Sequence, residues 1–591
     1  MRRFLLTTLP FLACTLLAGM PARGSEQQLP NMGSSAGAIL SPEEQRQYGF
    51  YLLHELRNQG AVVDDALLTD YINMIGYRLV AYSPKPDQPF TFFIVRDTSI
   101  NAFALPGGFV GINAGLITTT ANENELAAVL AHEISHVTQQ HLVRAVEAEQ
   151  KYAPLMVLAM VGAIVASAHQ SPYNTSNSGV GAIVTAEGIA EQMQINFTRA
   201  DESEADRIGI QTLAKAGYDP DSMADFFERM QHALRPGFDE NDIPALLMDH
   251  PVTNQRISEA RERAEAMRKG VKPTIDVGTP CEPNSTTCAK TTTTYTEKTH
   301  LPGNDLSAAI LMPTFNYAPT SPLGKLLNAA SKGDLWGASS EEYYELMRER
   351  VRVLASPTPS QTATYYADNL HNDPSFNTLP NRYGYALALL NAGNAKQAQS
   401  VSGKLIEKQP NNLVLQLAAG ESELMTGERD ASLKRYTSLE SNYPDNRALA
   451  MSQAQALLQS GDKKAARHAQ EILRPQLEKN DEDPEMQTLF ARACELAGDP
   501  VRAGESHAAA AYLNGRAEDA LNQLKELLKR SDLDYYQRSR IEARISEFTP
   551  IVLELRRRKI KPGDQGKFEV SACVAATCNA LSSGRNNKPL Q

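Results

Sequence analysis

Four glycines recur at a nearly constant spacing in the second half of the chain. Gly393, Gly427 and Gly461 are 34 residues apart, and Gly498 follows after 37. A period of 34 residues is typical of helix–turn–helix repeats, which bury their apolar faces only by stacking on their neighbours. The spacing therefore predicts a curved α-solenoid over residues 380–550, with a concave face that binds proteins.

The repeat period is that of tetratricopeptide repeats. A plain helical bundle is the alternative, and the regular spacing disfavours it. We expect a helical connector over residues 311–379 and a C-terminal tail over residues 551–591. Residues 271–310 are rich in Thr, Pro and Ser and lack the apolar side chains of a core, so they predict a linker or a surface insertion.

A pentad of metal-binding type lies in the first half of the chain, where residues 132–136 read H-E-I-S-H. Asn122 precedes an amphipathic segment and predicts the N-cap of a helix through the pentad. His132 and His136 then share one helix face and can bind a single Zn²⁺. Glu133 can take a proton from a water molecule that the metal activates. The alternative is a solvated helix with two chance histidines.

A zinc site needs a third protein ligand, and the best candidate lies in a second predicted helix. Glu202 and Asp206 are four residues apart and share a face, so we expect Glu202 to bind the metal. We expect Asp206 to orient a histidine and to support catalysis with Glu133. Glu204 should face Arg207 and solvent. His141 should turn to the far side of the zinc helix.

Strand signals lie just before the pentad. Residues 90–95 are aromatic and β-branched, and a Pro-Gly-Gly turn at residues 106–108 predicts a hairpin. The fold class expected for the first domain is therefore mainly α with a small sheet. An edge strand formed by Asn101, Ala102, Phe103 and Ala104 could pair with an extended substrate. An ordinary hairpin packed on the helix is the alternative.

Taken together, four segments resemble the M48-type zinc metalloproteases and, in the last segment, their periplasmic branch. The segments are residues 101–108 (N-A-F-A-L-P-G-G), 132–136 (H-E-I-S-H), 202–206 (E-S-E-A-D) and 250–257 (H-P-V-T-N-Q-R-I). The resemblance implies a zincin-type protease domain, which we place at residues 25–270.

The resemblance also implies roles for single residues. His132, His136 and Glu202 would hold one Zn²⁺ per chain, and Glu133 would be the catalytic base. His250 would be a regulatory fourth ligand that occupies the open position of the zinc; a histidine that only fixes a turn before Pro251 is the alternative.

The same resemblance implies substrates and partners. The substrates would be unfolded, stalled or misassembled proteins, above all outer-membrane β-barrel precursors. The repeats would dock on the outer-membrane protein assembly machinery. A chaperone or assembly scaffold with a largely latent protease site is the alternative.

The N-terminus has the features of a cleaved export signal. Basic residues precede an apolar run, and the small residues Ala22 and Gly24 lie at positions −3 and −1 of a cleavage site, so residues 1–24 read as a signal peptide and the mature chain as periplasmic. Removal of its three arginines changes the formal net charge from −11 to −14. Such a charge argues against a nucleic-acid partner.

The cysteines fit an oxidising compartment. Cys281 and Cys288 form one local pair and Cys573 and Cys578 another, so both pairs read as short-loop disulfides. Cys494 falls in a repeat helix and should be a small buried apolar residue.

Two apolar segments, residues 152–168 and 179–190, lie between the two helices of the zinc site. We interpret them as a helical hairpin that acts as a lid. A partial dip into a membrane leaflet, and so a peripheral membrane contact, is the alternative.

Overall fold

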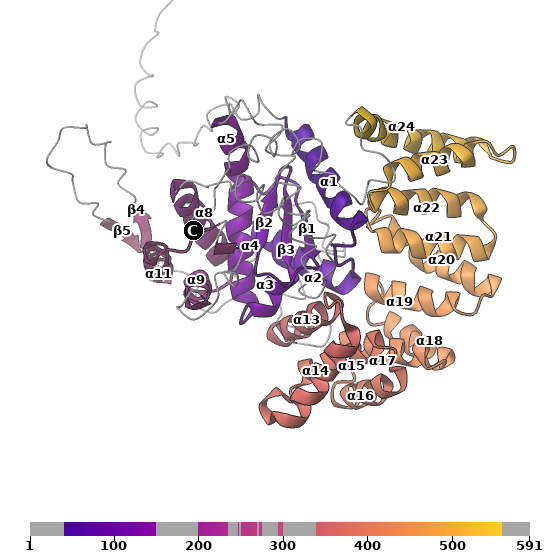
Figure 1. Cartoon of the computed structure of the whole chain (residues 1–591), viewed down its shortest axis with the longest axis horizontal. Helices are drawn as coiled ribbons and strands as arrows, with labels where there is room; N and C mark the ends of the chain where they lie inside the picture. Colours follow the sequence, from indigo (N-terminus) through magenta and orange to yellow (C-terminus); the bar gives the residue numbers. More distant parts are fainter. Residues whose placement is uncertain are drawn as a thin grey trace, which may run out of the picture.

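The described part of the chain consists mainly of helices around one small sheet (Figure 1). In this sheet, β1 runs parallel to the central strand β3, and β2 pairs antiparallel with β3. The computed structural model describes residues 41–148, 199–233, 246–247, 250–268, 271–274, 294–298 and 339–557. The strands are β1 (Thr91–Val95), β2 (Ala102–Leu105) and β3 (Phe109–Asn113). The predicted fold class, mainly α with a small sheet and helical repeats, is confirmed.

Two successive glycines make the turn between β2 and β3. Gly107 and Gly108 have φ angles of 79° and 87°. A Cβ atom added at Gly108 would lie 2.1 Å from the carbonyl oxygen of Pro89, so only glycine fits. The strand order β1-β3-β2 leaves β2 at an edge of the sheet.

Helices cover both faces of the sheet. Helix α1 (Pro42–Asn58) packs on one face, whereas α2 (Ala66–Val80) and α4 (Glu123–Thr138) pack on the other. All five residues of β3 are therefore buried. Helix α3 (Ala114–Thr119) follows β3 directly. Asn122 caps α4 as predicted, because its side chain accepts a hydrogen bond from the backbone N–H of Glu125.

Helix α4 packs closely against α8 (Arg199–Lys215). Gly209 of α8 faces the backbone of Ala131, where an added Cβ atom would lie 3.3 Å from the carbonyl oxygen of Ala131. The small residue lets the two helices approach closely. Three shorter or outer helices complete this domain: α5 (His141–Ala148), α9 (Ser222–Ala233) and α11 (Asn254–Arg268).

The second half of the chain stacks helices in antiparallel pairs. The predicted glycines lie in the turns between paired helices, and Gly393, Gly427, Gly461 and Gly498 all have φ between 68° and 87°. An added Cβ atom would meet nothing within 4 Å at the first three, so the positive φ rather than space requires glycine. The helices are α13 (Ser340–Leu354), α14 (Pro359–Asn372), α15 (Leu379–Asn391), α16 (Ala395–Lys408), α17 (Leu413–Met425), α18 (Arg429–Glu440), α19 (Arg447–Leu458), α20 (Lys463–Leu477), α21 (Pro484–Ala497), α22 (Pro500–Leu513), α23 (Ala517–Leu528) and α24 (Tyr535–Arg557), with a 3₁₀ turn η3 (Pro374–Phe376).

Regular structure occurs within the predicted tail and within the predicted linker or insertion. Helix α24 runs to Arg557, past the predicted start of the tail at residue 551, because Ile551 and Val552 still pack on α23. The predicted linker or insertion contains paired antiparallel strands, β4 (Val271–Thr274) and β5 (Thr294–Lys298). The other domain limits stay predictions.

Several expectations concern residues outside the described ranges. These are the signal peptide, the two predicted disulfide pairs and the apolar segments at residues 152–168 and 179–190. Cys494 is a buried free cysteine, as predicted. Among the described helices, each is too short or too polar to span a membrane.

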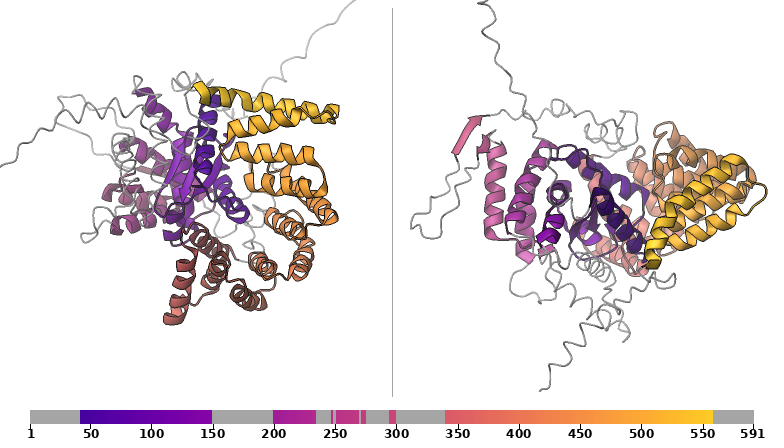
Figure 2. Two further views of the ribbon diagram at one scale, coloured as in Figure 1. Left: turned by 45° about the vertical axis from the view of Figure 1, so that its right-hand side comes forward. Right: turned by 90° about the horizontal axis from the view of Figure 1, so that it is seen from above.

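The repeats curve around and contact the first domain at both ends (Figure 2). Helix α13 packs on α2 and α3, and α22 packs on α1. Buried arginines reinforce the inner side of this arc. Arg447 of α19 lies 3.0 Å from both Asp70 of α2 and Asp483, and Arg350 forms a bidentate pair with Asp65 at 2.8 and 2.6 Å.

The far end of the arc is closed by close packing on α1. His54 meets the ring of Tyr512 edge-on, with centroids 4.9 Å apart. Gly515 has φ of 77°, and an added Cβ atom there would lie 2.4 Å from the carbonyl oxygen of His54. Burial lowers the pKa of His54 to about 3, so the ring is neutral in this interface.

Candidate metal centre

Four metal-binding side chains meet in a buried cluster. Helix α4 supplies His132 and His136, α8 supplies Glu202, and the segment before α11 supplies His250. One donor atom from each lies within 4.8 Å of the others. The Nε2 atoms of the two α4 histidines are 3.0 Å apart, and each is 3.5 Å from a carboxylate oxygen of Glu202. The fold thus brings together the three predicted ligands and the predicted regulatory ligand.

The geometry of this cluster fits a zinc ion. Donor atoms bound to one zinc ion at 2.0–2.1 Å lie about 3.3 Å apart in a tetrahedral arrangement. The measured separations of 3.0 and 3.5 Å lie on either side of that value. Two imidazoles and one carboxylate also match the His₂Glu donor sets of catalytic zinc sites.

The charges around the cluster also favour a divalent cation. Three carboxyl groups are buried in and beside it, those of Glu133, Glu202 and Asp206. Among the described residues, Arg256 is the permanently charged cation that contacts Glu202 and Asp206. The three carboxyl groups outnumber the single guanidinium, and a divalent metal ion would offset this imbalance.

Strong electrostatic coupling is evident in the pKa values. Burial alone would lower the pKa of His132, but the carboxylates of Asp206 and Glu202 raise it to about 10. Burial alone would raise the pKa of Glu202, but His250 and His132 hold it well below its usual range. Burial and the neighbouring His132 and His250 keep the pKa of His136 well below its ordinary value. The cluster therefore holds an ionised carboxylate and attracts positive charge at neutral pH.

Asp206 lies where it can orient His132. Its Oδ1 atom is 3.0 Å from Nδ1 of His132, on the side of the ring opposite the cluster. Burial alone would raise the pKa of Asp206, but Arg256 and His132 keep it below its usual value. This geometry agrees with the predicted role, which stays a prediction.

Arg256 is a functional residue that no pattern in the sequence predicted, although it lies within residues 250–257, which resemble the family. Its guanidinium donates from Nε and Nη2 to the two oxygens of Asp206, both at 2.8 Å. Its Nη1 atom lies 2.9 Å from Glu202. Arg256 therefore fixes both acidic side chains of α8 that face the cluster.

Glu133 is buried next to the cluster, and its Oε1 atom lies 3.7 Å from Nε2 of His250. The space beside these residues is very small. A cavity of about 20 Å³ is lined by His132, Glu133, His250 and apolar side chains of α4, α9 and the segment before α11. Such a volume holds about one water molecule. The described residues therefore leave too little space beside Glu133 for a peptide substrate.

The expected position of His141 is wrong. Helix α4 ends at Thr138, and Gln140 adopts a left-handed φ of 57°, which redirects the chain into α5. Nδ1 of His141 consequently lies 2.9 Å from Nδ1 of His136. Glu204 does pair with Arg207, as expected, with Oε1 3.8 Å from Nη2, but its Oε2 atom also lies 3.2 Å from Nε2 of His141. The left-handed conformation of Gln140 thus places His141 next to His136 instead of on the far side of α4.

The predicted substrate strand lies near the segment that carries His250. Ala102, Phe103 and Ala104 pair with β3, and Asn101 accepts a hydrogen bond from Asn113 just before β2 begins. One residue earlier, the carbonyl of Ile100 accepts a hydrogen bond of 3.1 Å from the backbone N–H of Leu246. The backbone N–H of His250 in turn donates to the carbonyl of Leu246 at 2.8 Å, so His250 is linked through Leu246 to the chain at the start of the edge strand.

A helix with the H-E-x-x-H pentad, a glutamate from a second helix and a buried general base candidate define the zinc metallopeptidase class. Residues 66–264 match the family model described as peptidase family M48. The chain therefore carries a peptidase family M48 domain.

Curated relatives agree with this assignment. The β-barrel assembly-enhancing protease of Escherichia coli (strain K12) is 41% identical over 268 residues, which is 44% of this chain and 53% of the relative. The protein of the same name from Yersinia pestis is 40% identical over 265 residues, again 44% and 53% of the two chains. The mitochondrial metalloendopeptidase OMA1 of Schizosaccharomyces pombe is 28% identical over 194 residues, 33% of this chain and 52% of the relative.

The chain spans about half the length of the curated relatives it matches. The family match and the buried His–Glu cluster together confirm the predicted zinc cofactor.

We expect the substitution Asp206→Asn to weaken zinc binding by about 10–100-fold, because loss of a group that orients a metal ligand has this effect. Competition with a chromophoric chelator would measure the affinity. Asp225→Asn is the control, because Asp225 is half exposed and pairs with Arg261 on the surface. Equal affinities of Asp206→Asn and the native chain would contradict the assigned role.

Proposed function

We propose that this chain is a periplasmic zinc-dependent endopeptidase that cleaves misfolded or misassembled proteins, above all outer-membrane β-barrel precursors. The observation that carries the proposal is the placement of Glu133 next to the buried His132–His136–Glu202 cluster. The names of the relatives, which refer to β-barrel assembly and to proteolysis, support the substrate class.

The chemistry follows from the roles of the side chains. A zinc ion held by His132, His136 and Glu202 would polarise the scissile carbonyl and acidify the attacking water. Glu133 accepts the proton of this water at its carboxylate and returns it to the leaving amine. Asp206 and Arg256 keep His132 and Glu202 in place during these steps.

Strand β2 is suited to hold an extended substrate. It is an edge strand and lies against α4, which carries Glu133. Substrate backbone that paired with Asn101–Ala104 would be read through main-chain hydrogen bonds rather than side chains. Such recognition suits a protease of unfolded or stalled chains.

His250 acts as a latch in this proposal. Its Nδ1 atom lies 2.8 Å from Glu202 and 3.5 Å from Nε2 of His132. His250 is therefore close enough to bind the same metal ion as these two residues. A catalytic zinc ion needs one open position, which a fourth protein ligand would fill. The same segment is bonded to Ile100 beside the edge strand. Its release would free both the metal and the substrate strand.

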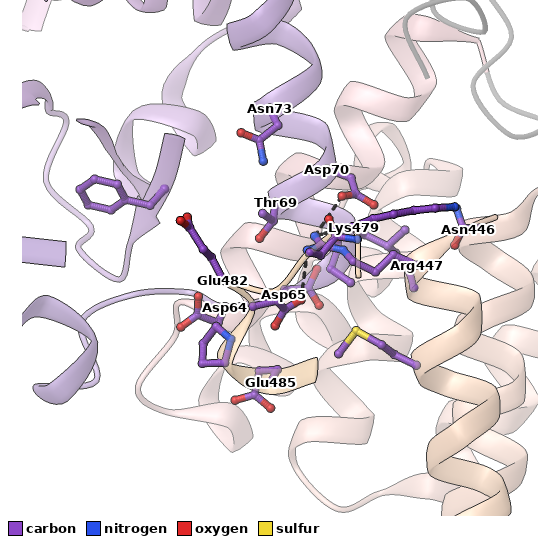
Figure 3. A pocket seen from close by; sticks show the side chains of 18 of the residues that line it. Asp64, Asp65, Thr69, Asp70, Asn73, Asn446, Arg447, Lys479, Glu482 and Glu485 are labelled. Carbon is purple, nitrogen blue, oxygen red and sulfur yellow. Dashed lines mark hydrogen bonds and ion pairs between the residues drawn. The ribbon is translucent and has the colours of Figure 1, made fainter. Parts of the chain in front are cut away.

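The repeats provide the docking site for the assembly machinery. A cavity of about 1160 Å³ lies between their inner side and helices α1 and α2 (Figure 3). Nine of the residues that line it are Asp or Glu, and five are Arg or Lys. Glu482 and Glu485 project into it from the segment at the start of α21, opposite Asp64. This acidic excess suits a partner segment that presents basic or other donor groups.

Other features agree with export and a protein partner. The predicted signal peptide places the mature chain in the periplasm, and the acidic net charge disfavours nucleic acid. The lid expected from residues 152–168 and 179–190 stays a prediction, with a peripheral membrane contact as its alternative.

The chaperone or scaffold alternative is favoured by one observation, the closed site with about 20 Å³ of space. A latch explains the same closed site, because the release of His250 would open it for catalysis.

Replacement of the base by Glu133→Gln should lower the cleavage rate of an unfolded protein by about 10²–10⁴-fold, because general base catalysis contributes that much. Bound zinc, measured by inductively coupled plasma mass spectrometry, should stay near one ion per chain. Glu440→Gln on the exposed side of α18 is the control. Full activity of Glu133→Gln would refute the mechanism, and zinc without cleavage in any variant would favour the scaffold alternative.

Release of the latch by His250→Ala should raise the cleavage rate of the same substrate severalfold, because the open metal position becomes accessible. His371→Ala, which changes an exposed histidine of α14, is the matched control. A rate equal to or below that of the native chain would end the latch hypothesis.

Charge reversal in the cavity, Glu482→Lys with Glu485→Lys, should weaken binding of the purified β-barrel assembly complex by about tenfold or more, because like charges repel a basic partner segment. Cleavage of a short peptide should not change. Glu471→Lys on the exposed side of α20 is the control. Unaltered binding of the double variant would place the docking site elsewhere.

A further inference from the structure

The break between α4 and α5 gives His141 a position that a continuous helix would not allow. A residue five positions after His136 would project from a different side of an unbroken helix. Instead, the left-handed φ of Gln140 turns the chain, and Arg144 N–H then bonds to the carbonyl of Gln140 in the first turn of α5. The rings of His136 and His141 meet edge-on with centroids 4.8 Å apart.

The two histidines belong to a continuous chain of polar contacts. Nδ1 of His141 lies 2.9 Å from Nδ1 of His136, and Nε2 of His141 lies 3.2 Å from Oε2 of Glu204. Arg144 donates to the same oxygen of Glu204 at 3.0 Å and to Asp201 at 2.9 Å. His141 is 1% exposed, so water does not compete for its ring nitrogens.

These contacts define the direction of the hydrogen bonds. A carboxylate only accepts, so Nε2 of His141 must donate to Glu204. A neutral imidazole that donates from Nε2 accepts at Nδ1, so the Nδ1–H group of His136 is the donor in the contact between the rings. The lone pair of Nε2 in His136 is then left for the metal cluster.

We propose that His141, together with Glu204 and Arg144, is a positioning relay that fixes the tautomer and the ring orientation of the metal ligand His136. The proposal rests on the proposed function of this site as a zinc centre. Ligand histidines are ordinarily oriented by a carboxylate, a carbonyl or water. His132 has a carboxylate in this role, Asp206, whereas His136 reaches its carboxylate through the imidazole of His141.

Helix α8 thus serves the metal centre three times. Glu202 faces the cluster, Asp206 lies behind His132, and Glu204 lies behind His141. Helix α8 therefore supplies one metal-binding carboxylate and also the acidic side chains that orient His132 directly and His136 through His141.

A second metal ion is the other interpretation of this group, because His141, Asp201 and Glu204 lie within ligand distance of one another. The guanidinium of Arg144 argues against it. Arg144 lies within 3.0 Å of both carboxylates and already supplies the positive charge that an ion would bring.

The test compares the full chain with the variants His141→Ala and His141→Gln. Zinc affinity is measured by chelator competition, and the visible spectrum is recorded after substitution with Co²⁺. We expect His141→Ala to bind zinc about 10–100-fold more weakly and to change the Co²⁺ spectrum. We expect His141→Gln, which keeps one donor and one acceptor, to recover part of both losses. His468→Ala, an exposed histidine of α20, is the matched control.

Each outcome decides between the interpretations. Lower thermal stability of His141→Ala with unchanged zinc affinity and Co²⁺ spectrum would show a purely structural role and overturn the relay. Two zinc ions in the native chain and one in His141→Ala would establish a second metal site instead. A native chain that binds no zinc would refute the proposed function and would overturn the relay with it, whereas the first two outcomes overturn the relay alone.

Discussion

The close packing of α4 against α8 is the contact on which the rest of the functional site depends. Gly209 allows the two helices to approach, and the approach buries charged side chains from both. Buried carboxylates are costly unless hydrogen bonds and opposite charges compensate them. Arg256 and the histidines supply part of that compensation, and a metal ion held by the cluster would supply the rest, so that the helix contact and the metal centre would stabilise each other.

The large cavity beside the repeats and the metal centre lie on different sides of the first domain. The cavity is lined by α1, α2, β1 and repeat helices, whereas the cluster lies between α4, α8 and the segment before α11. A partner held by the repeats would therefore leave the metal centre uncovered. Signals between the two regions would have to pass through the sheet and α2, which contacts both α4 and α19.

Several parts of the molecule could be predicted because they depend on local chemistry. The glycine spacing predicted the helical turns, since only a positive φ at those positions closes them. The pentad predicted the ligand pair of α4, because residues four apart share a helix face. The acidic segment predicted Glu202 and Asp206 for the same reason. We expected Glu202 to meet the two histidines of α4 because two imidazoles and one carboxylate are a common donor set for zinc.

What the sequence by itself determined was therefore the repeat period and the helical placement of the residues that meet in the cluster, both of which are governed by short-range periodicity. Only the tertiary structure decided the roles of Arg256 and His141. The contact of Arg256 with Asp206 spans 50 positions, and that of His141 with Glu204 depends on one left-handed residue. It also decided that His250 lies among the ligands and that the repeats close on α1. Packing between segments that are distant in the sequence fixes these contacts, and helix periodicity does not predict which distant segments pack together.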